Sequence, residues 1–279
     1  MLFTEVTESS PDVGAREIVA QSWTHLHELL FEGSWNDELQ RHRSHHAFRG
    51  NSNANYRLEP SLMRIGEGYH EREKHLLRNF QKYAHRNVVE KDSVWHWLSV
   101  AQHHGLPTRL MDWTYSPLVA LHFATHNIRE FGIDGCVWKV DYDEIHEHLP
   151  DSLKKALRAE GAHIFTVGIL DKYVKDLAAL DKMPSDLNDF LLFFEPPSLD
   201  DRIMNQFAYF SIASNPTLVI DDWFSRVTSP RAWQKIVIPA GLKWEVRDKL
   251  DQANISERVL FPGLDGLSRW LRRHYTKRV

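Results

Sequence analysis

The tripeptide Phe48-Arg49-Gly50 places an arginine where a short predicted strand runs into a polar turn. The planar guanidinium of arginine pairs two donors at a time with the oxygens of a phosphate or a carboxylate. Two roles therefore suit Arg49: it binds a phosphorylated ligand, or it pairs with a carboxylate such as Glu59 and holds the turn. We expect the first role, with Gly50 beside Arg49 in the binding site.

Candidate proton-transfer groups gather in the segment that ends at Asp112. His103 and His104 are adjacent, so on a helix their side chains point about 100° apart and only one of them can face a common site. Imidazole and carboxylate groups are common general bases. We take His104 and Asp112 as catalytic candidates, with His103 as the other choice. The alternative is that Asp112 braces Arg109 or His104.

Three further polar residues could either bind a ligand or stabilise the local structure. Thr114 and Ser116 precede Pro117, and Ser before Pro is a typical helix start, so Ser116 either caps a helix or orients a ligand. Gln206 opens the segment 206–212, whose aromatic alternation predicts a strand. There its amide hydrogen-bonds a ligand hydroxyl or satisfies buried backbone groups.

Metal binding has weak support in the sequence. The chain has 17 histidines, and this richness alone would favour a metal-dependent nuclease or hydrolase. His122 and His126 share a face of a predicted helix, but no His-Glu-x-x-His motif accompanies them, and a single cysteine excludes thiolate clusters. We therefore expect no metal, and we expect Cys136 to be a core residue of a strand.

The composition is that of a globular protein without a membrane-spanning segment. The chain has 279 residues, a net charge of −4 and 42% hydrophobic residues. Residues 1–16 lack the apolar core of a signal peptide, and no stretch approaches the roughly 18 apolar residues that span a membrane. We predict a cytoplasmic protein with no membrane partner. Neither a Gly-x-Ser-x-Gly elbow nor a Gly-x-x-x-x-Gly-Lys-Ser/Thr loop is present, which argues against those hydrolase and NTPase classes.

The near-neutral charge provides no general field for nucleic acid, so such a partner would need a local patch. A basic cluster near the end of the chain is either a solvated helix face or a binding site. Its members are Arg269, Arg272, Arg273, Lys277 and Arg278.

Strands scattered among helices predict an α+β fold with mixed or antiparallel sheets and flanking helices. We expect a flexible segment at 1–15 and a single domain at 16–279, with a motif-rich half at 16–132 and a second half at 133–279. Apolar spacing and turn residues predict helices over 15–31, 71–86, 93–104, 117–128, 243–253 and 265–275, and strands over 47–50, 135–140, 206–212 and 235–238.

Three segments resemble the FRG domain family, which takes its name from the Phe-Arg-Gly tripeptide. The first is 47–62, around Phe48-Arg49-Gly50. The second is 101–124, which includes the run His103-His104-Gly105-Leu106-Pro107-Thr108-Arg109. The third is weaker and comprises Arg202, Gln206 and Phe210, followed by 236–239 and 260–267. Ala208 stands where the family usually has glycine.

A more distant resemblance links the same residues to ADP-ribosyltransferases, whose first core strand carries an arginine that binds NAD. This resemblance implies a split-sheet core and an NAD site formed by Arg49, Gly50, Thr114, Ser116 and Phe123. Gln206 stands where those enzymes usually have a glutamate. The implied function is transfer of ADP-ribose from NAD to a macromolecule, either nucleic acid or protein, by a bacterial toxin or anti-phage effector with a possible antitoxin or inhibitor protein as partner. The alternative is a non-catalytic module that binds a nucleotide or a partner protein.

Overall fold

The structure is a computed structural model that describes residues 16–84 and 93–277. The predicted flexible segment 1–15 lies outside the described residues, as do positions 85–86 of a predicted helix and Arg278 of the basic cluster.

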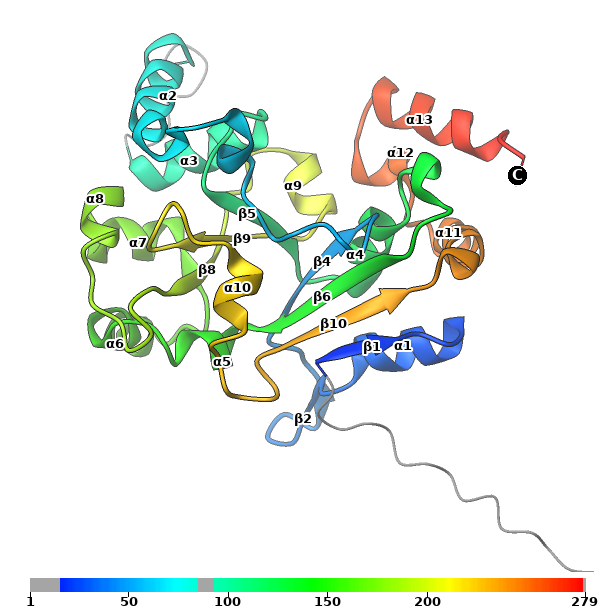
Figure 1. Ribbon diagram of the computed structural model, residues 1–279, viewed down its shortest axis with the longest axis horizontal. Coiled ribbons are helices and arrows are strands. Elements are labelled where there is room, and N and C mark those ends of the chain that lie inside the picture. The colour runs from blue at the N-terminus through cyan, green and yellow to red at the C-terminus, as the bar shows by residue number, and fades with distance from the viewer. Residues whose placement is uncertain (1–15, 85–92, 278–279) are drawn as a thin grey trace, which may run out of the picture.

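An eight-stranded mixed sheet forms the centre of the molecule, and helices cover both of its faces (Figure 1). Neighbouring strands are antiparallel, except for the parallel pairs β1–β10 and β7–β8. In spatial order, the strands are β1 (Glu17–Val19), β10 (Trp233–Ile238), β6 (Gly135–Asp141), β4 (His46–Asn51), β5 (Leu110–Thr114), β9 (Ala208–Ala213), β8 (Leu191–Glu195) and β7 (Phe165–Thr166). This architecture confirms the predicted α+β class.

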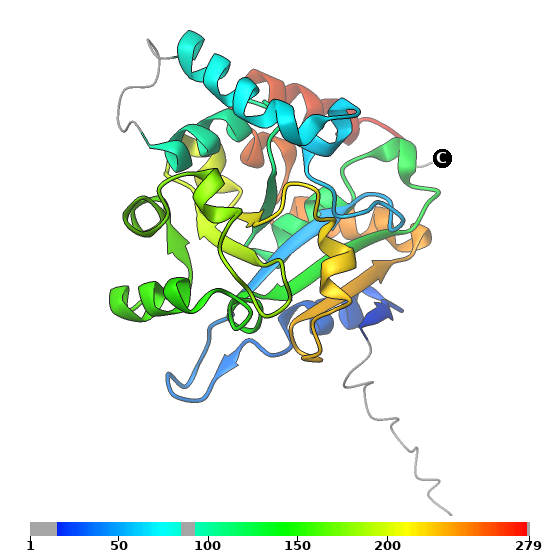
Figure 2. The same ribbon diagram turned by 60° about the vertical axis from the view of Figure 1, so that its left-hand side comes forward.

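A separate hairpin of β2 (Trp35–Asn36) and β3 (Arg41–His42) projects from the body of the molecule, as Figure 2 shows. It precedes β4 in the chain.

One face of the sheet carries a single continuous core. Side chains alternate along strands, so Ala47, Met111, Trp113 and Trp138 point to this face from three different strands. Two short helices cover them: α5 (Tyr142–His146) and α10 (Ile220–Phe224).

The opposite face carries two separate cores. Over β10, β6 and β4 lie α1 (Trp23–Phe31), α4 (Pro117–Ala124) and α11 (Lys243–Gln252). Over β5, β9 and β8 lie α2 (Tyr69–Ala84), α3 (Val94–His103), α6 (Asp151–Glu160), α7 (Val167–Tyr173) and α8 (Leu177–Leu180). The remaining helices are α9 (Asp201–Asn205), α12 (Glu257–Leu260), α13 (Leu264–His274) and the 3-10 turns η1 (Ser61–Ile65), η2 (Ile128–Glu130) and η3 (Ala240–Leu242).

The sheet opens where these two cores meet. β4 and β5 are joined by a single pair of partner residues, Phe48 opposite Thr114. Beyond that pair the two strands diverge, although each keeps a full ladder with its other neighbour, β6 or β9. The divergence leaves backbone groups of both strands without a ladder partner, and buried groups of this kind need another hydrogen bond.

Three predicted elements are corrected by the structure. The predicted helix over 117–128 ends at Ala124, and Ile128 belongs to the 3-10 turn η2. The predicted helix over 15–31 begins only at Trp23, after Ser22, whose side chain caps the helix. Residues 17–19 instead pair as a strand with β10, from the other end of the chain. The predicted strand over 206–212 begins only at Ala208, because Gln206 ends helix α9 and Phe207 turns the chain with φ of 50°.

The predictions are confirmed for strands β4, β6 and β10 and for helices α11 and α13. Each predicted end lies within two residues of the observed one. In the described parts of the chain, no helix has both the length and the apolar character needed to cross a membrane.

Candidate functional site

A cavity of about 610 Å³ occupies the opening between β4 and β5. Residues 48–51 of β4 and 112–114 of β5 form its sides. The loop after β4, η1, the ends of α3 and α4, α9 and the first half of β9 complete the wall. Their contributions are Ser52, Tyr56, Arg57, Glu59, Arg64, Gln102, His103, Phe123, His126, Arg202, Ile203, Gln206, Ala208 and Phe210.

Arg49 reaches across this opening. Its Nη1 donates a hydrogen bond of 2.6 Å to the backbone carbonyl of Asp112, one of the groups that the divergence of the strands exposes. No carboxylate of residues 16–84 or 93–277 pairs with Arg49, so the expected alternative of an ion pair with Glu59 is not what the structure shows. Burial lowers the pKa of Arg49, the charge of Arg64 lowers it further, and Asp112 partly opposes them. A desolvated cation that forms no ion pair with a described carboxylate therefore lines the cavity.

Gly50 lines the cavity, and α4 packs directly on its Cα. A Cβ atom at this position would lie 1.9 Å from the carbonyl oxygen of Ala120 and 2.5 Å from the amide nitrogen of Ala124. Glycine is therefore required here by the close approach of a helix to the strand. The packing places the end of α4, with Phe123, at the cavity wall.

Asp112 lies in the cavity with its carboxylate oriented by a short chain of hydrogen bonds. Gln102 Nε2 donates to Asp112 Oδ2 at 2.8 Å, and Gln102 Oε1 accepts from the hydroxyl of Thr108 at 2.6 Å. Asp112 braces neither Arg109 nor His104, contrary to the structural alternative. Arg109 is instead buried in ion pairs with Glu73 and Asp181. The second carboxylate oxygen of Asp112 has no partner among the hydrogen bonds of the described chain.

The two adjacent histidines face different surroundings, as their spacing requires. His103 lines the cavity, and its Nε2 lies 2.8 Å from Asp200 Oδ2. His104 follows the end of α3, is exposed, and does not line the cavity. The geometry favours His103 over the predicted His104 as the histidine at this site.

The predicted hydroxyl residues also separate. Thr114 lines the cavity, although its Oγ1 accepts a hydrogen bond of 3.0 Å from the amide of Ser116. Ser116 caps α4, where its side chain accepts from the Val119 amide, and it does not line the cavity. The helix-capping alternative therefore accounts for Ser116.

Gln206 lines the cavity from the end of α9, and one of its amide hydrogens is already used. Its Nε2 donates to the carbonyl of Leu260 at 2.9 Å, and the neighbouring Asn205 donates to the carbonyl of Val259. These bonds fasten α9 to α12. The side chain therefore satisfies a backbone group, as one alternative held, while it remains on the cavity surface.

Three arginines of the cavity, Arg57, Arg64 and Arg202, were not among the predicted site residues. Arg64, in η1, donates to the backbone carbonyl of Glu59 at 3.0 Å, and Arg202 lies over the ring of Phe261. Neither pairs with a carboxylate in the described parts of the chain, whereas Arg57 pairs with Asp221 and Asp222. No sequence signal distinguished Arg64, while Arg202 belongs to the weak third segment of the FRG resemblance.

Side chains of Glu130 and Lys243 hold the turn after β4 in place. Glu130 accepts hydrogen bonds from the hydroxyls of Ser52 and Tyr56, which lower its pKa against the effect of burial. The buried Lys243 donates to the backbone carbonyls of Ser52 and Glu130 at 2.6 and 2.9 Å. These contacts hold the rim of the cavity.

Of the other candidate residues, only His126 lines the cavity among the described residues. His122 is buried and its Nδ1 lies 3.0 Å from Arg247, whereas His126 bonds the carbonyl of Phe123, so the two do not converge. Cys136 is buried in β6, as predicted, and burial raises the pKa of its thiol to about 12. Such a thiol is a core group, because the thiolate is the reactive form.

Residues 44–132 match the family model of the FRG domain. The chain therefore contains an FRG domain in this segment, which holds Arg49, Asp112, Thr114 and Phe123 and ends before Gln206. No curated protein and no solved structure matches the chain. The resemblance to ADP-ribosyltransferases stays a prediction.

Proposed function

We propose that this protein transfers ADP-ribose from NAD to a macromolecule, nucleic acid or protein, in the bacterial cytoplasm, as a toxin or anti-phage effector. The observation that carries the proposal is Arg49, a half-buried guanidinium that lines a cavity of about 610 Å³ and pairs with no carboxylate among the described residues. A desolvated cation of this kind is stabilised by an anionic ligand.

The charge of the cavity favours a ligand with more than one phosphate. Arg64 and Arg202 join Arg49 in the wall, and none of the three forms an ion pair with a described carboxylate. Arginine binds phosphate oxygens through its planar fork. The volume lies within the range of small-molecule and cofactor sites. A pyrophosphate bound by Arg49, Arg64 and Arg202 would leave the ring of Phe123 free to stack on a nucleotide base.

The reaction would break the bond between the ribose and nicotinamide and form a bond from the ribose to an oxygen or nitrogen of the target. Nicotinamide leaves as a neutral molecule, and the target atom loses its proton to a base. Asp112 is the carboxylate best placed for that proton, because Gln102 holds one of its oxygens and the other is unpaired in the described chain. His103 offers a second base in the same wall.

Binding of NAD by the Arg49→Ala variant tests the proposal. The lost charge-assisted contact, worth roughly 1.5–3 kcal/mol, should weaken binding about 10- to 150-fold. Arg49→Lys keeps the charge without the fork and should restore part of the affinity. Arg158→Ala, on the exposed surface of α6, should bind as the wild type does.

Nicotinamide release in the presence of cell extract tests the chemistry separately from binding. The wild type should release nicotinamide and label a macromolecule of the extract, and nuclease or protease treatment then identifies the target class. An Arg49→Ala variant that labels its target as fast as the wild type would contradict the proposed role of Arg49. Failure of the wild type to bind NAD would refute the proposal as a whole.

A non-catalytic nucleotide-binding module is the second candidate, and Gln206 favours it. A glutamine supplies no negative charge to a ribose cation, and its amide is already bonded to Leu260. NAD that binds to the wild type but is never cleaved would decide for this alternative.

A further inference from the structure

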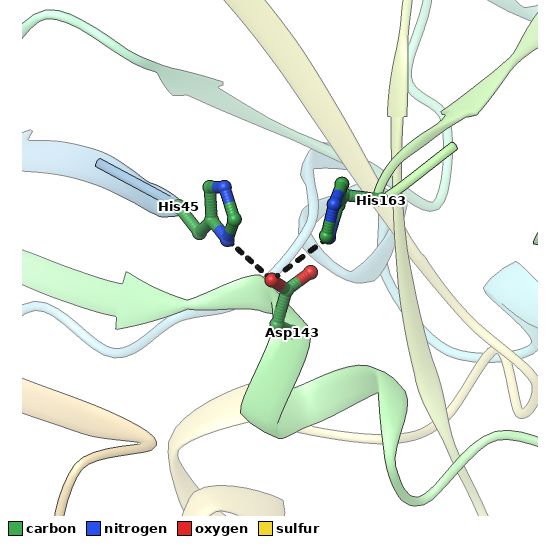
Figure 3. Close-up of side chains that lie close together, drawn as sticks. All are labelled: His45, Asp143 and His163. Atoms are coloured by element: carbon green, nitrogen blue, oxygen red, sulfur yellow. Dashed lines mark hydrogen bonds and ion pairs between the residues drawn. The ribbon is translucent and has the colours of Figure 1, made fainter. Parts of the chain in front are cut away.

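His45, Asp143 and His163 bring three possible metal ligands to one point at the start of β4 (Figure 3). Nδ1 of His45 and Nδ1 of His163 both face Oδ2 of Asp143, the second at 3.1 Å. All three ligand atoms lie within 4.8 Å of one another. In a tetrahedral zinc site with bonds of about 2.0–2.2 Å, neighbouring ligand atoms are about 3.4 Å apart. Small side-chain rotations would therefore admit an ion.

The three ligands lie in different parts of the fold: His45 before β4, Asp143 in α5 and His163 before β7. A hydrogen bond to a backbone group of each residue holds it in place. The Tyr142 amide donates to the carbonyl of His45 at 3.0 Å, next to the register pair of His46 with Asp141. The amide of Asp143 donates to the Asp141 side chain at the start of α5. The cluster therefore follows from the sheet register and from the first turn of α5.

The third ligand is held by a buried neutral histidine. His146 Nε2 accepts from the Phe193 amide at 3.0 Å, so the proton of the ring is on Nδ1, which donates to the carbonyl of His163 at 3.1 Å. Because both of its ring nitrogens are occupied, His146 supports His163 and cannot act as a fourth ligand.

We propose that His45, Asp143 and His163 form a zinc site with a fourth coordination position open to solvent. Two imidazoles and one carboxylate are a ligand set that suits Zn²⁺ and related transition metals better than Mg²⁺ or Ca²⁺. The side chain of His163 is 66% exposed, so water has access to the ion. The ion joins the start of β4 to α5 and to the segment before β7 (Phe165–Thr166).

This site was not expected from the sequence, which predicted no metal. The only spacing considered there was that of His122 and His126, whose side chains diverge. The three residues of the proposed site are far apart in the chain, and the pairing of β4 with β6 brings the first two together.

Competition between the untagged full-length protein and a chromophoric zinc chelator tests the proposal. The wild type should bind one tight equivalent of Zn²⁺. His163→Ala and Asp143→Asn should each weaken that equivalent more than about 100-fold, because loss of a supporting residue alone typically costs 10- to 100-fold. His163 is exposed, so the metal-free melting temperature of His163→Ala should equal that of the wild type.

His148→Ala is the matched control. His148 also pairs with a carboxylate, Asp186 at 3.0 Å, but no second histidine of the described residues joins that pair. This variant should keep the tight equivalent, and one equivalent of Zn²⁺ should raise its melting temperature as it does that of the wild type. Absence of a tight equivalent in the wild type, its persistence in His163→Ala and Asp143→Asn, or its loss in His148→Ala would each overturn the proposal.

Discussion

Three successive residues of β4 perform three different tasks. Phe48 is buried in the core beneath α4, and Arg49 lines the cavity on the way to Asp112. Gly50 allows the backbone of α4 to approach the strand. Successive side chains of a strand point to opposite faces, so Phe48 and Arg49 face different surroundings. The tripeptide therefore combines residues needed for packing with a residue placed for binding.

Gly50→Ala should destabilise the protein by about 3 kcal/mol, because its Cβ would overlap backbone atoms of α4 that cannot move like a side chain. Urea unfolding measures the change. Gly132→Ala is the matched control, since a Cβ there meets nothing within 4 Å. A Gly50→Ala variant as stable as Gly132→Ala would contradict this account of the tripeptide.

At the scale of elements, a buried ion network anchors α13. Arg273 donates to Glu257 and to Asp251, with four contacts of 2.7 Å. Burial alone would raise the pKa of Glu257, but the bonds from Arg273 and the charge of Arg247 lower it to about 2. Arg273 is therefore not part of a solvated basic face, which corrects its place in the predicted basic cluster.

Arg273→Ala should cost about 3–5 kcal/mol, because it removes the hydrogen-bonded partner of the buried Glu257 and leaves only the longer contact with Arg247 at 3.8 Å. Urea unfolding gives the magnitude, and limited proteolysis shows whether α13 is released. Arg272→Ala removes the neighbouring exposed arginine and should change stability by less than about 0.5 kcal/mol. Equal effects of the two substitutions would argue against the anchor.

The elements that the sequence predicts well are those whose pattern is local. The apolar run of β6 and the helical spacing of α11 are complete within their own segments. β1 is different, because three residues pair with a strand more than 200 positions away, and their apolar spacing also fits the first turn of a helix. Its partner could not be read from residues 17–19.

The same distinction separates the site residues. Arg49, Gly50, Asp112, Thr114, Phe123 and Gln206 all line the cavity, whereas Ser116 and His104 do not. The helix start at Ser116 is a local signal, and it accounts for that residue. Arg64 and Arg202 escaped prediction because their place in the wall depends on how η1 and α9 pack around the opening.

For the whole molecule, buried histidines predict a loss of stability in mild acid. Burial lowers the pKa of His146 to about 4 and that of His46 to about 3. In the unfolded chain both titrate near 6.5, so between those values the unfolded state binds more protons. Their contribution is complete above about pH 6.5 and is lost as the pH falls towards 4.

The free energy of unfolding should therefore decrease by about 3 kcal/mol from His146 alone between pH 7.5 and 4. Urea titrations at half-unit intervals measure the slope, and His148→Ala, which removes a partly exposed histidine, serves as the control. A flat profile between pH 6.5 and 4.5 would contradict the neutral state of His146. Glu257, whose pKa is lowered from 4.5 to about 2, adds its own loss of stability only as the pH falls from about 4.5 towards 2.

The single pair of partners between β4 and β5 has a mechanical consequence. The two halves of the sheet are connected at β4 and β5 by one residue pair only. A ligand bound between these strands would therefore supply contacts in place of the missing backbone hydrogen bonds. A ligand that contacts both Arg49 of β4 and Asp112 of β5 would hold the two strands at a fixed distance. Its binding would then reduce the motion of one half of the sheet relative to the other.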